Sequence, residues 1–281
     1  MTSPAPTTSP TSASFADRLR GTGIWSSALR YADKVRAAEC TSELESLGYS
    51  AVWLPDVGGD LFESVENLLA ATSTITVATG ILNLWMHEAD ETAERHAAFT
   101  RDHGHRFLVG IGVSHAPLID LAEQGRYAKP LTKMREYLDG LDAAAEPLPA
   151  ADRVLAALGP KMLELARTRT AGCHPYLVTP DHTAVAREAL GAGSLVAPEQ
   201  AVVLETDPTK AREIARRHKT RHVRAFERAE NLLLNLKADD VFRTIAVGHA
   251  RHFHRHRKTW VTASTGRRGS VMNAVDVRHA A

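Results

Sequence analysis

Residues 76–113 read TVATGILNLWMHEADETAERHAAFTRDHGHRFLVGIGV, and this stretch carries the pattern that decides the fold. Two runs rich in β-branched and aliphatic residues, Thr76–Leu82 and Arg106–Val113, predict strands. The stretch between them, Glu91–His103, predicts a helix. A strand, a helix and a second strand in this order are typical of a βα unit in a parallel sheet.

The same alternation continues on both sides of this stretch, from Gly23 to about His218. Seven strand–helix pairs follow one another with no long linker, which favours one α/β barrel of the TIM type, (β/α)8, over two open sheets. The predicted strands are Gly23–Trp25, Ala51–Leu54, Thr76–Leu82, Arg106–Val113, Arg153–Leu158, His174–Val178 and Val202–Leu204. The predicted helices are Ala32–Leu47, Phe62–Thr74, Glu91–His103, Pro130–Ala145, Pro160–Thr170, Thr183–Leu190 and Pro208–His218.

An eighth strand, which a closed barrel requires, is not clear in the sequence. Arg243–Val247 (RTIAV) is a weak candidate. We therefore expect the barrel to be incomplete at its C-terminus, with strand eight absent or replaced. The edges of the first and seventh strands would then be exposed.

The composition is that of a globular protein with a full hydrophobic core. Of 281 residues, 44% are hydrophobic and 24% are charged, which excludes a wholly disordered chain, although the length also allows two domains. Cys40 and Cys173 lack the spacing of a zinc site or a disulfide framework, and no apolar run is long enough to cross a bilayer. We expect a cytoplasmic protein without a metal, and a disordered tail over residues 1–20 rather than a secretion signal.

The C-terminal part of the chain differs from the rest in its charge. Residues 220–281 carry ten Arg and two Lys against five acidic residues, a net charge of +7, whereas the remaining residues carry −6. We therefore divide the chain into an N-terminal tail, 1–20, a barrel domain, 21–219, and a divergent basic tail rich in His and Arg, 220–281. A basic tail can bind nucleic acid, but few aromatic residues are interleaved and no nucleic-acid motif is present, so nucleic acid is not the expected partner. We interpret the tail as a non-homologous replacement, for example from a shifted reading frame.

Polar residues and glycines after the predicted strands are the candidates for a ligand site, because such barrels bind ligands at the C-terminal ends of their strands. Asp56 could position a ligand or share a proton with it, or could cap the next helix. Gly80 interrupts the third strand, which indicates a close backbone approach to a ligand or a packing contact within the barrel. The remaining candidates are Gly112, Ser114 and His115 after the fourth strand, Gly159, Pro160, Lys161 and Met162 at a helix start that suits a phosphate, and His174, Tyr176 and His182 around the sixth strand.

Five segments carry a resemblance to a known family: ATGILNLW, RFLVGIGVSHA, LAALGPKMLELA, GCHPYLVTPDHT and PEQAVVLETDPTKAREIARRH. In this order they resemble the bacterial luciferase-like monooxygenase superfamily, in particular its actinobacterial branch of F420-dependent oxidoreductases. The resemblance runs from about Gly23 to His218 and fades in the basic tail, where family members have a further helix and an eighth strand.

The resemblance implies a cofactor site at the mouth of the barrel. In that family a cis peptide bond in strand three supports the flavin or deazaflavin ring, and Gly80 and Ile81 are the matching pair, with Leu82 and Asn83 beside them. The turn formed by Gly112, Val113 and Ser114 matches the segment that lines the ring and the phospholactate side of the cofactor. Gly159 to Met162 match the helix start that receives the phosphate, and His174 and Tyr176 are further implied cofactor contacts.

Asp56 and His115 are the implied catalytic residues. Asp56 matches the polar end of strand two, where several relatives have His next, whereas this chain has Val57. His115 stands where some relatives have a glutamate. Lys161 and Arg126 are the candidates to meet an acidic tail of the cofactor.

The implied reaction is hydride transfer between coenzyme F420 and an unknown small organic substrate. FMN-dependent monooxygenation is the alternative within the same superfamily, because the two cofactors share a ring shape and a phosphate. A second alternative is a catalytically inactive barrel whose basic tail binds nucleic acid or a protein partner. Relatives commonly dimerise, so the resemblance also allows a homodimer.

Overall fold

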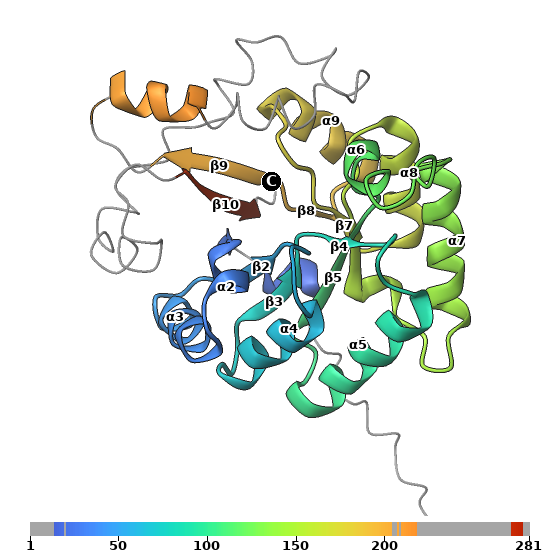
Figure 1. Cartoon of the computed structure of the whole chain (residues 1–281), viewed down its shortest axis with the longest axis horizontal. Coiled ribbons are helices and arrows are strands. Elements are labelled where there is room, and N and C mark those ends of the chain that lie inside the picture. Colours follow the sequence, from blue (N-terminus) through green and yellow to red (C-terminus); the bar gives the residue numbers. More distant parts are fainter. Residues whose placement is uncertain (1–13, 20, 204–206, 208, 218–270, 278–281) are drawn as a thin grey trace, which may run out of the picture.

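Strands and helices alternate along the chain as the sequence predicts (Figure 1). The computed structural model describes residues 14–19, 21–203, 207, 209–217 and 271–277. The strands are β1 (Gly21–Trp25), β2 (Ala51–Leu54), β3 (Thr76–Thr79), β4 (Leu82–Asn83), β5 (Phe107–Gly112), β6 (Arg153–Leu155), β7 (Gly172–Cys173), β8 (Leu195–Val196), β9 (Glu199–Val203) and β10 (Val271–Val277). The helices are α1 (Phe15–Arg18), α2 (Ala28–Tyr31), α3 (Lys34–Ser46), α4 (Leu61–Ala70), α5 (Ala89–His103), α6 (Ala116–Ile119), α7 (Pro130–Ala143), the 3-10 helix η1 (Ala150–Asp152), α8 (Pro160–Arg169) and α9 (Pro180–Leu190), followed by a helical segment over 209–217.

The strands are hydrogen-bonded in a sheet that curls back on itself. Pairing follows the order β8-β7-β6-β5-β3-β2-β1-β10-β9, and β4 pairs with β5. Only Ala197 and Pro198 separate β8 from β9 in the sequence, so the last strand of this order is joined directly to the first. Tyr176, just after β7, also forms a parallel bridge with Glu199 in β9. The predicted α/β fold of the TIM type is confirmed.

The place of a parallel eighth strand is taken by β10, which is antiparallel to both of its neighbours. The sequence left strand eight as absent or replaced and did not indicate β10, and the expected exposure of the neighbouring edges is wrong. All five residues of β1 pair with β10, and all five residues of β9 pair with its other side. The weak candidate Arg243–Val247 and most of the basic tail lie outside the described residues.

The sheet separates two hydrophobic clusters, one inside the ring and one between the ring and the helices. Because successive side chains of a strand point to opposite faces, β2 contributes Ala51 and Trp53 to the inner cluster and Val52 and Leu54 to the outer one. The helices cover the outer face with apolar stripes. In α4 this stripe consists of Leu61, Phe62, Val65, Leu68 and Leu69, all buried.

Helix α1 closes the N-terminal end of the barrel. Its Phe15 and the following Leu19 belong to the inner cluster and are 1% and 0% exposed. The predicted disordered tail over 1–20 therefore ends earlier than expected, because two apolar side chains in its last part fill the base of the ring. Residues 1–13 lie outside the described residues.

Several boundaries differ from the sequence prediction, and three of the differences bear on the barrel mouth or its closure. The sixth strand is Gly172–Cys173 rather than His174–Val178, because Pro175 has no N–H group to continue the ladder. The third strand stops at Thr79 and resumes as β4 beside β5. Before β9, the chain forms the two-residue strand β8, which is too short to be recognised from its own sequence.

Candidate functional site

The break between β3 and β4 lies at the C-terminal end of the barrel and is held by neighbouring strands. The peptide bond between Gly80 and Ile81 is cis, as the resemblance implied. The Gly80 N–H donates to the Leu54 carbonyl at 2.7 Å, and the indole Nε1–H of Trp25 donates to the Gly80 carbonyl at 2.6 Å. A Cβ atom on Gly80 would lie 2.8 Å from the Trp25 ring and 3.1 Å from Nε2 of His174, so this position requires glycine.

Next to this break, Ile81, Gly112 and Ala156 form an apolar surface, which we call the Ile81 surface. A Cβ on Gly112 would lie 2.7 Å from the Ile81 side chain and 3.3 Å from Ala156 Cβ, so the three residues are in close contact. They come from three successive strands of the ring, at the ends of β3, β5 and β6. Ile81 and Ala156 stay partly exposed, so a flat apolar ligand has a surface to lie on.

His174 supports this region from inside the barrel. Its ring stacks on Trp53 with centroids 4.2 Å apart and an angle of 13° between planes. Nδ1 donates to the Ala197 carbonyl at 2.7 Å, so Nε2 carries the lone pair of the neutral imidazole. Burial lowers the pKa of His174 to about 4, and Nε2 has no hydrogen-bond partner among the described residues. His174 is therefore neutral near pH 7 and faces Gly80 as an acceptor.

Asp56 is fixed by the chain around it. Oδ2 of its carboxylate accepts a hydrogen bond from the Asn83 N–H at 3.0 Å and lies 3.0 Å from Nε2 of His87. The side chain of Asp56 is only 4% exposed. The hydrogen bond from His87 to Asp56 raises the pKa of His87. Asp56 thus ties the loop after β2 to the segment that follows β4.

The turn after β5 contains Val113, Ser114 and His115 at the barrel mouth. The Val113 carbonyl accepts a hydrogen bond from Nε1 of Trp85 at 2.7 Å, and Ser114 has a positive φ of 55°. His115 is the N-cap residue of α6, and burial lowers its pKa, which keeps the imidazole neutral near pH 7. All three side chains are partly exposed.

The start of α8 lies beside the start of α9. Nε2 of His182, in the first turn of α9, donates to the Leu158 carbonyl at 2.8 Å, immediately before the α8 N-cap residue Gly159. Pro160 and Lys161 are exposed, and apart from Gly159 and its two chain neighbours no described residue has a heavy atom within 4 Å of the position that a Cβ on Gly159 would take. Two helix N-termini and a lysine in this arrangement attract an anion.

The other predicted site residues do not all face the barrel mouth. Leu82 is 0% exposed and belongs to the outer cluster, and Met162 packs against the same cluster, so the two side chains face the helix layer. The amide oxygen of Asn83 accepts a hydrogen bond from the Trp85 N–H at 3.2 Å. Tyr176 is partly buried, and burial raises the pKa of its hydroxyl.

The sequence analysis missed four residues that shape this region. They are Trp25, Ala156, Trp85 and His87. Trp25 is the last residue of β1 and Ala156 directly follows β6. Both therefore stand at strand ends, where residues of a ligand site are expected. Trp85 and His87 lie in a connection, and no local pattern reveals that they meet Val113 and Asp56.

Comparison with known proteins places these features in a family. The family model described as "Luciferase-like monooxygenase" matches residues 20–225. A protein of Mycobacterium tuberculosis, whose name provisionally describes it as a coenzyme F420-dependent oxidoreductase, is 30% identical over 105 residues. That match covers 36% of this chain and 30% of the length of the relative.

Solved structures share the fold at low sequence identity. An F420-dependent secondary alcohol dehydrogenase in complex with an F420-acetone adduct has a TM-score of 0.61 at 13% identity, with 86% of this chain and 89% of that chain covered. The coenzyme F420-dependent tetrahydromethanopterin reductase of Methanopyrus kandleri has a TM-score of 0.58 at 16% identity, with 87% and 91% covered. The oxygenating constituent of 3,6-diketocamphane monooxygenase of Pseudomonas putida, in complex with FMN, has a TM-score of 0.54 at 13% identity, with 87% and 89% covered.

Two kinds of feature, a membrane-spanning helix and a metal-binding cluster, are absent from the described residues. No helix among them is both long and apolar enough to span a membrane. They also contain no group of three or more His, Cys, Asp or Glu side chains with the geometry to hold a metal ion. Because the family model matches well over half of the sequence, this chain belongs to the luciferase-like monooxygenase family.

Proposed function

We propose that this chain is an oxidoreductase that binds coenzyme F420 at the barrel mouth and acts on a small organic substrate. Family membership, the F420-dependent relative and the two F420-dependent fold neighbours support this proposal. The observation that carries it is the Ile81 surface, a partly exposed apolar area formed by three neighbouring strands at the end of the barrel where such folds bind ligands. When bound, the coenzyme would accept or donate a hydride at its C5 atom.

The residues at the mouth fit such a cofactor in three respects. The Ile81 surface can support a flat ring, with the backbone of Leu82, Asn83, Val113 and Ser114 around it. The open space above Gly159 and the exposed Lys161 suit a phosphate beside the start of α8. Inside the barrel, Nε2 of His174, for which the described residues offer no hydrogen-bond partner, faces Gly80, and the His174 ring packs against this segment from below.

The two proposed catalytic residues differ in their surroundings. Asp56 already accepts hydrogen bonds from Asn83 and His87, so we assign it a positioning role: it holds the loop beside the Ile81 surface. His115 is partly exposed at the mouth and neutral near pH 7, so its imidazole can accept a proton from a substrate hydroxyl group. His115 is the catalytic residue of this proposal.

FMN-dependent monooxygenation is the second candidate function. The FMN-bound fold neighbour from Pseudomonas putida supports it, because the same barrel holds FMN there. The Ile81 surface and the start of α8 offer a ring support and a phosphate site to either cofactor.

Titration of the full-length protein with F420 and, separately, with FMN tests the proposal. Cofactor fluorescence should change on addition of protein and saturate with F420. Saturation with FMN alone would favour the second candidate, and failure with both cofactors would overturn both. A His115→Gln variant should bind the cofactor normally but turn over an alcohol substrate at least about a hundredfold more slowly, because one proton-transfer group is lost.

A further inference from the structure

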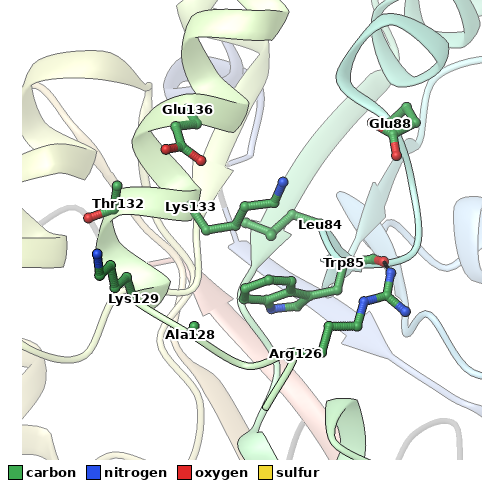
Figure 2. Close-up of a pocket in the computed structure, with 9 residues that line it drawn as sticks. All are labelled: Leu84, Trp85, Glu88, Arg126, Ala128, Lys129, Thr132, Lys133 and Glu136. Carbon is green, nitrogen blue, oxygen red and sulfur yellow. Dashed lines mark hydrogen bonds between the residues drawn. The ribbon is translucent and has the colours of Figure 1, made fainter. Parts of the chain in front are cut away.

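A cleft of about 320 Å³ lies between the segment after β4 and the start of α7 (Figure 2). Trp85 lines it, together with three cationic side chains, Arg126, Lys129 and Lys133, and two carboxylates, Glu88 and Glu136. These charges leave the lining with one net positive charge. The volume is at the lower end of the range for small-molecule sites, so a small organic molecule fits it.

The wall formed by Trp85 is fixed in place. Its indole N–H donates to the Val113 carbonyl at 2.7 Å, and Arg126 donates to the Trp85 carbonyl at 2.6 Å. The Trp85 ring also contacts Tyr127, with centroids 5.7 Å apart. Because the backbone and the side chain of Trp85 are both held, the indole presents a stable flat surface to the cleft.

The cations of the cleft differ from several arginines elsewhere in the barrel. Arg101 and Arg169 each have a carboxylate oxygen within 2.8 Å, and Arg153 has one at 2.6 Å. Within the described part of the chain, no ion pair of 4.0 Å or less involves Arg126, Lys129 or Lys133. Lys133 instead has its ammonium group 5.9 Å from the centre of the Trp85 ring. Three such cations around one cleft favour an anion between them.

We propose that this cleft binds a small organic anion whose flat or apolar part lies on Trp85 and whose carboxylate or phosphate oxygens contact Arg126, Lys129 and Lys133. Lys129, the N-cap residue of α7, and Lys133, in the first turns of that helix, both line the cleft, so both would lie beside the same ligand. Glu88 stands at the start of α5 and Glu136 one turn after Thr132 on α7, and both oppose an anion. Removal of either carboxylate should therefore strengthen binding.

Calorimetric titration of the full-length protein at low ionic strength tests this site. The probes are phthalate, phenyl phosphate and inorganic phosphate, which separate carboxylate from phosphate recognition and show whether the ring contributes. At least one of the two aromatic anions should bind more tightly than inorganic phosphate. A Lys129→Gln/Lys133→Gln variant should bind this anion about tenfold more weakly or worse, because two charged hydrogen-bond donors are lost.

Two further variants distinguish loss of the anion site from damage to the folded structure. Glu136→Gln should tighten binding a few-fold, an effect that a damaged structure would not produce. Lys210→Gln removes one positive charge, half of what the double variant removes, from an exposed residue that does not line the cleft, and it should leave the affinity unchanged. The proposal is overturned if neither aromatic anion binds the unaltered protein, if the double variant binds as well as the unaltered protein, or if Glu136→Gln weakens binding. No redox cofactor is needed, so these outcomes are separate from those of the F420 and FMN titrations.

Discussion

At the N-terminal end of the barrel, Phe15 and Leu19 fill the ring of strands and are almost fully buried. At the C-terminal end, Ile81 and Ala156 remain partly exposed although the strands below them are completely covered. Apolar side chains of α1 and of the residue that follows it close the first end. At the second end, hydrogen bonds hold the backbone of Gly80: its carbonyl accepts from the Trp25 indole, and its N–H donates to the Leu54 carbonyl. Packing at one end stabilises the barrel, and the other end can keep an apolar surface open for a ligand.

Each end also holds a carboxylate next to histidine. At the base, Oδ2 of Asp152 lies 3.4 Å from His96 and 3.6 Å from His105, and it makes no hydrogen bond among the described residues. At the mouth, Oδ2 of Asp56 lies 3.0 Å from His87 and also accepts a backbone N–H. The tighter geometry at the mouth fixes two loops relative to each other, which is what a binding surface requires.

Among the variants that test the difference between the two ends, Phe15→Ala should have the largest effect on the free energy of unfolding. Removal of a fully buried aromatic ring at the base should lower the free energy of unfolding by about 3–5 kcal/mol. Urea denaturation followed by circular dichroism measures this change. Cofactor affinity of the protein that remains folded should be unaltered, so a parallel loss of affinity would contradict the separation of the two ends.

A smaller loss of stability, with a clear loss of binding, is expected from Gly80→Ala. The added methyl group meets the Trp25 ring and His174, which should cost about 1–3 kcal/mol and displace the segment next to the Ile81 surface. Cofactor titration should show affinity reduced by about tenfold or more. Gly193→Ala is the matched control, because its methyl group would meet no atom within 4 Å, and unchanged affinity in both variants would count against the site.

Trp25→Phe removes the hydrogen bond to the Gly80 carbonyl and keeps an aromatic ring at this position. Loss of the indole N–H leaves that carbonyl without this donor, which should cost about 1 kcal/mol in unfolding free energy. Cofactor affinity should fall a few-fold, since the Ile81 surface loses one of its supports. A variant with lower stability and full affinity would show that Trp25 serves packing alone.

The smallest effect is a pH dependence from the Asp56–His87 pair. The pKa of His87 is raised in the folded state, so its contribution to stability is present below the unfolded value of about 6.5 and is lost as pH rises through the higher folded value. Because His87 is partly solvated, we expect less than about 1 kcal/mol. Unfolding of the unaltered protein and of His87→Gln should differ more at pH 6 than at pH 8. In an Asp56→Asn background this pH dependence should disappear, and its persistence there would assign it to another group.

Local sequence features located part of the candidate site. The glycine in TVATGIL marked Gly80 as an unusual position within the third strand, although the strand was predicted to continue to Leu82, and the resemblance identified Gly80–Ile81 as the cis bond that the structure contains. Gly112 was predicted to let the backbone approach a flat ligand, and in the structure it lies against the Ile81 side chain. The roles of these residues toward a cofactor are still predictions, which the titrations above test.

Other parts of the site depend on contacts between distant segments. Trp25 and Gly80 are 55 positions apart, and His87 and Asp56 are 31 apart. Nothing in the sequence near Asp56 indicates that its carboxylate is already engaged by Asn83 and His87. The prediction that β1 and the seventh strand have exposed edges failed for the same reason, since β10 reaches them from the far end of the chain.

The sequence by itself determined the order of strands and helices, the parallel sheet and the special position of Gly80 in the third strand, because these follow from short-range patterns of apolar residues, glycine and proline. Only the tertiary structure decided that the sheet closes through an antiparallel strand, that Trp25 and His174 meet at Gly80, and that a charged cleft forms beside Trp85. The physical reason is that curling of the sheet brings together side chains from strands far apart in the chain, and local patterns carry no information about which of them will meet.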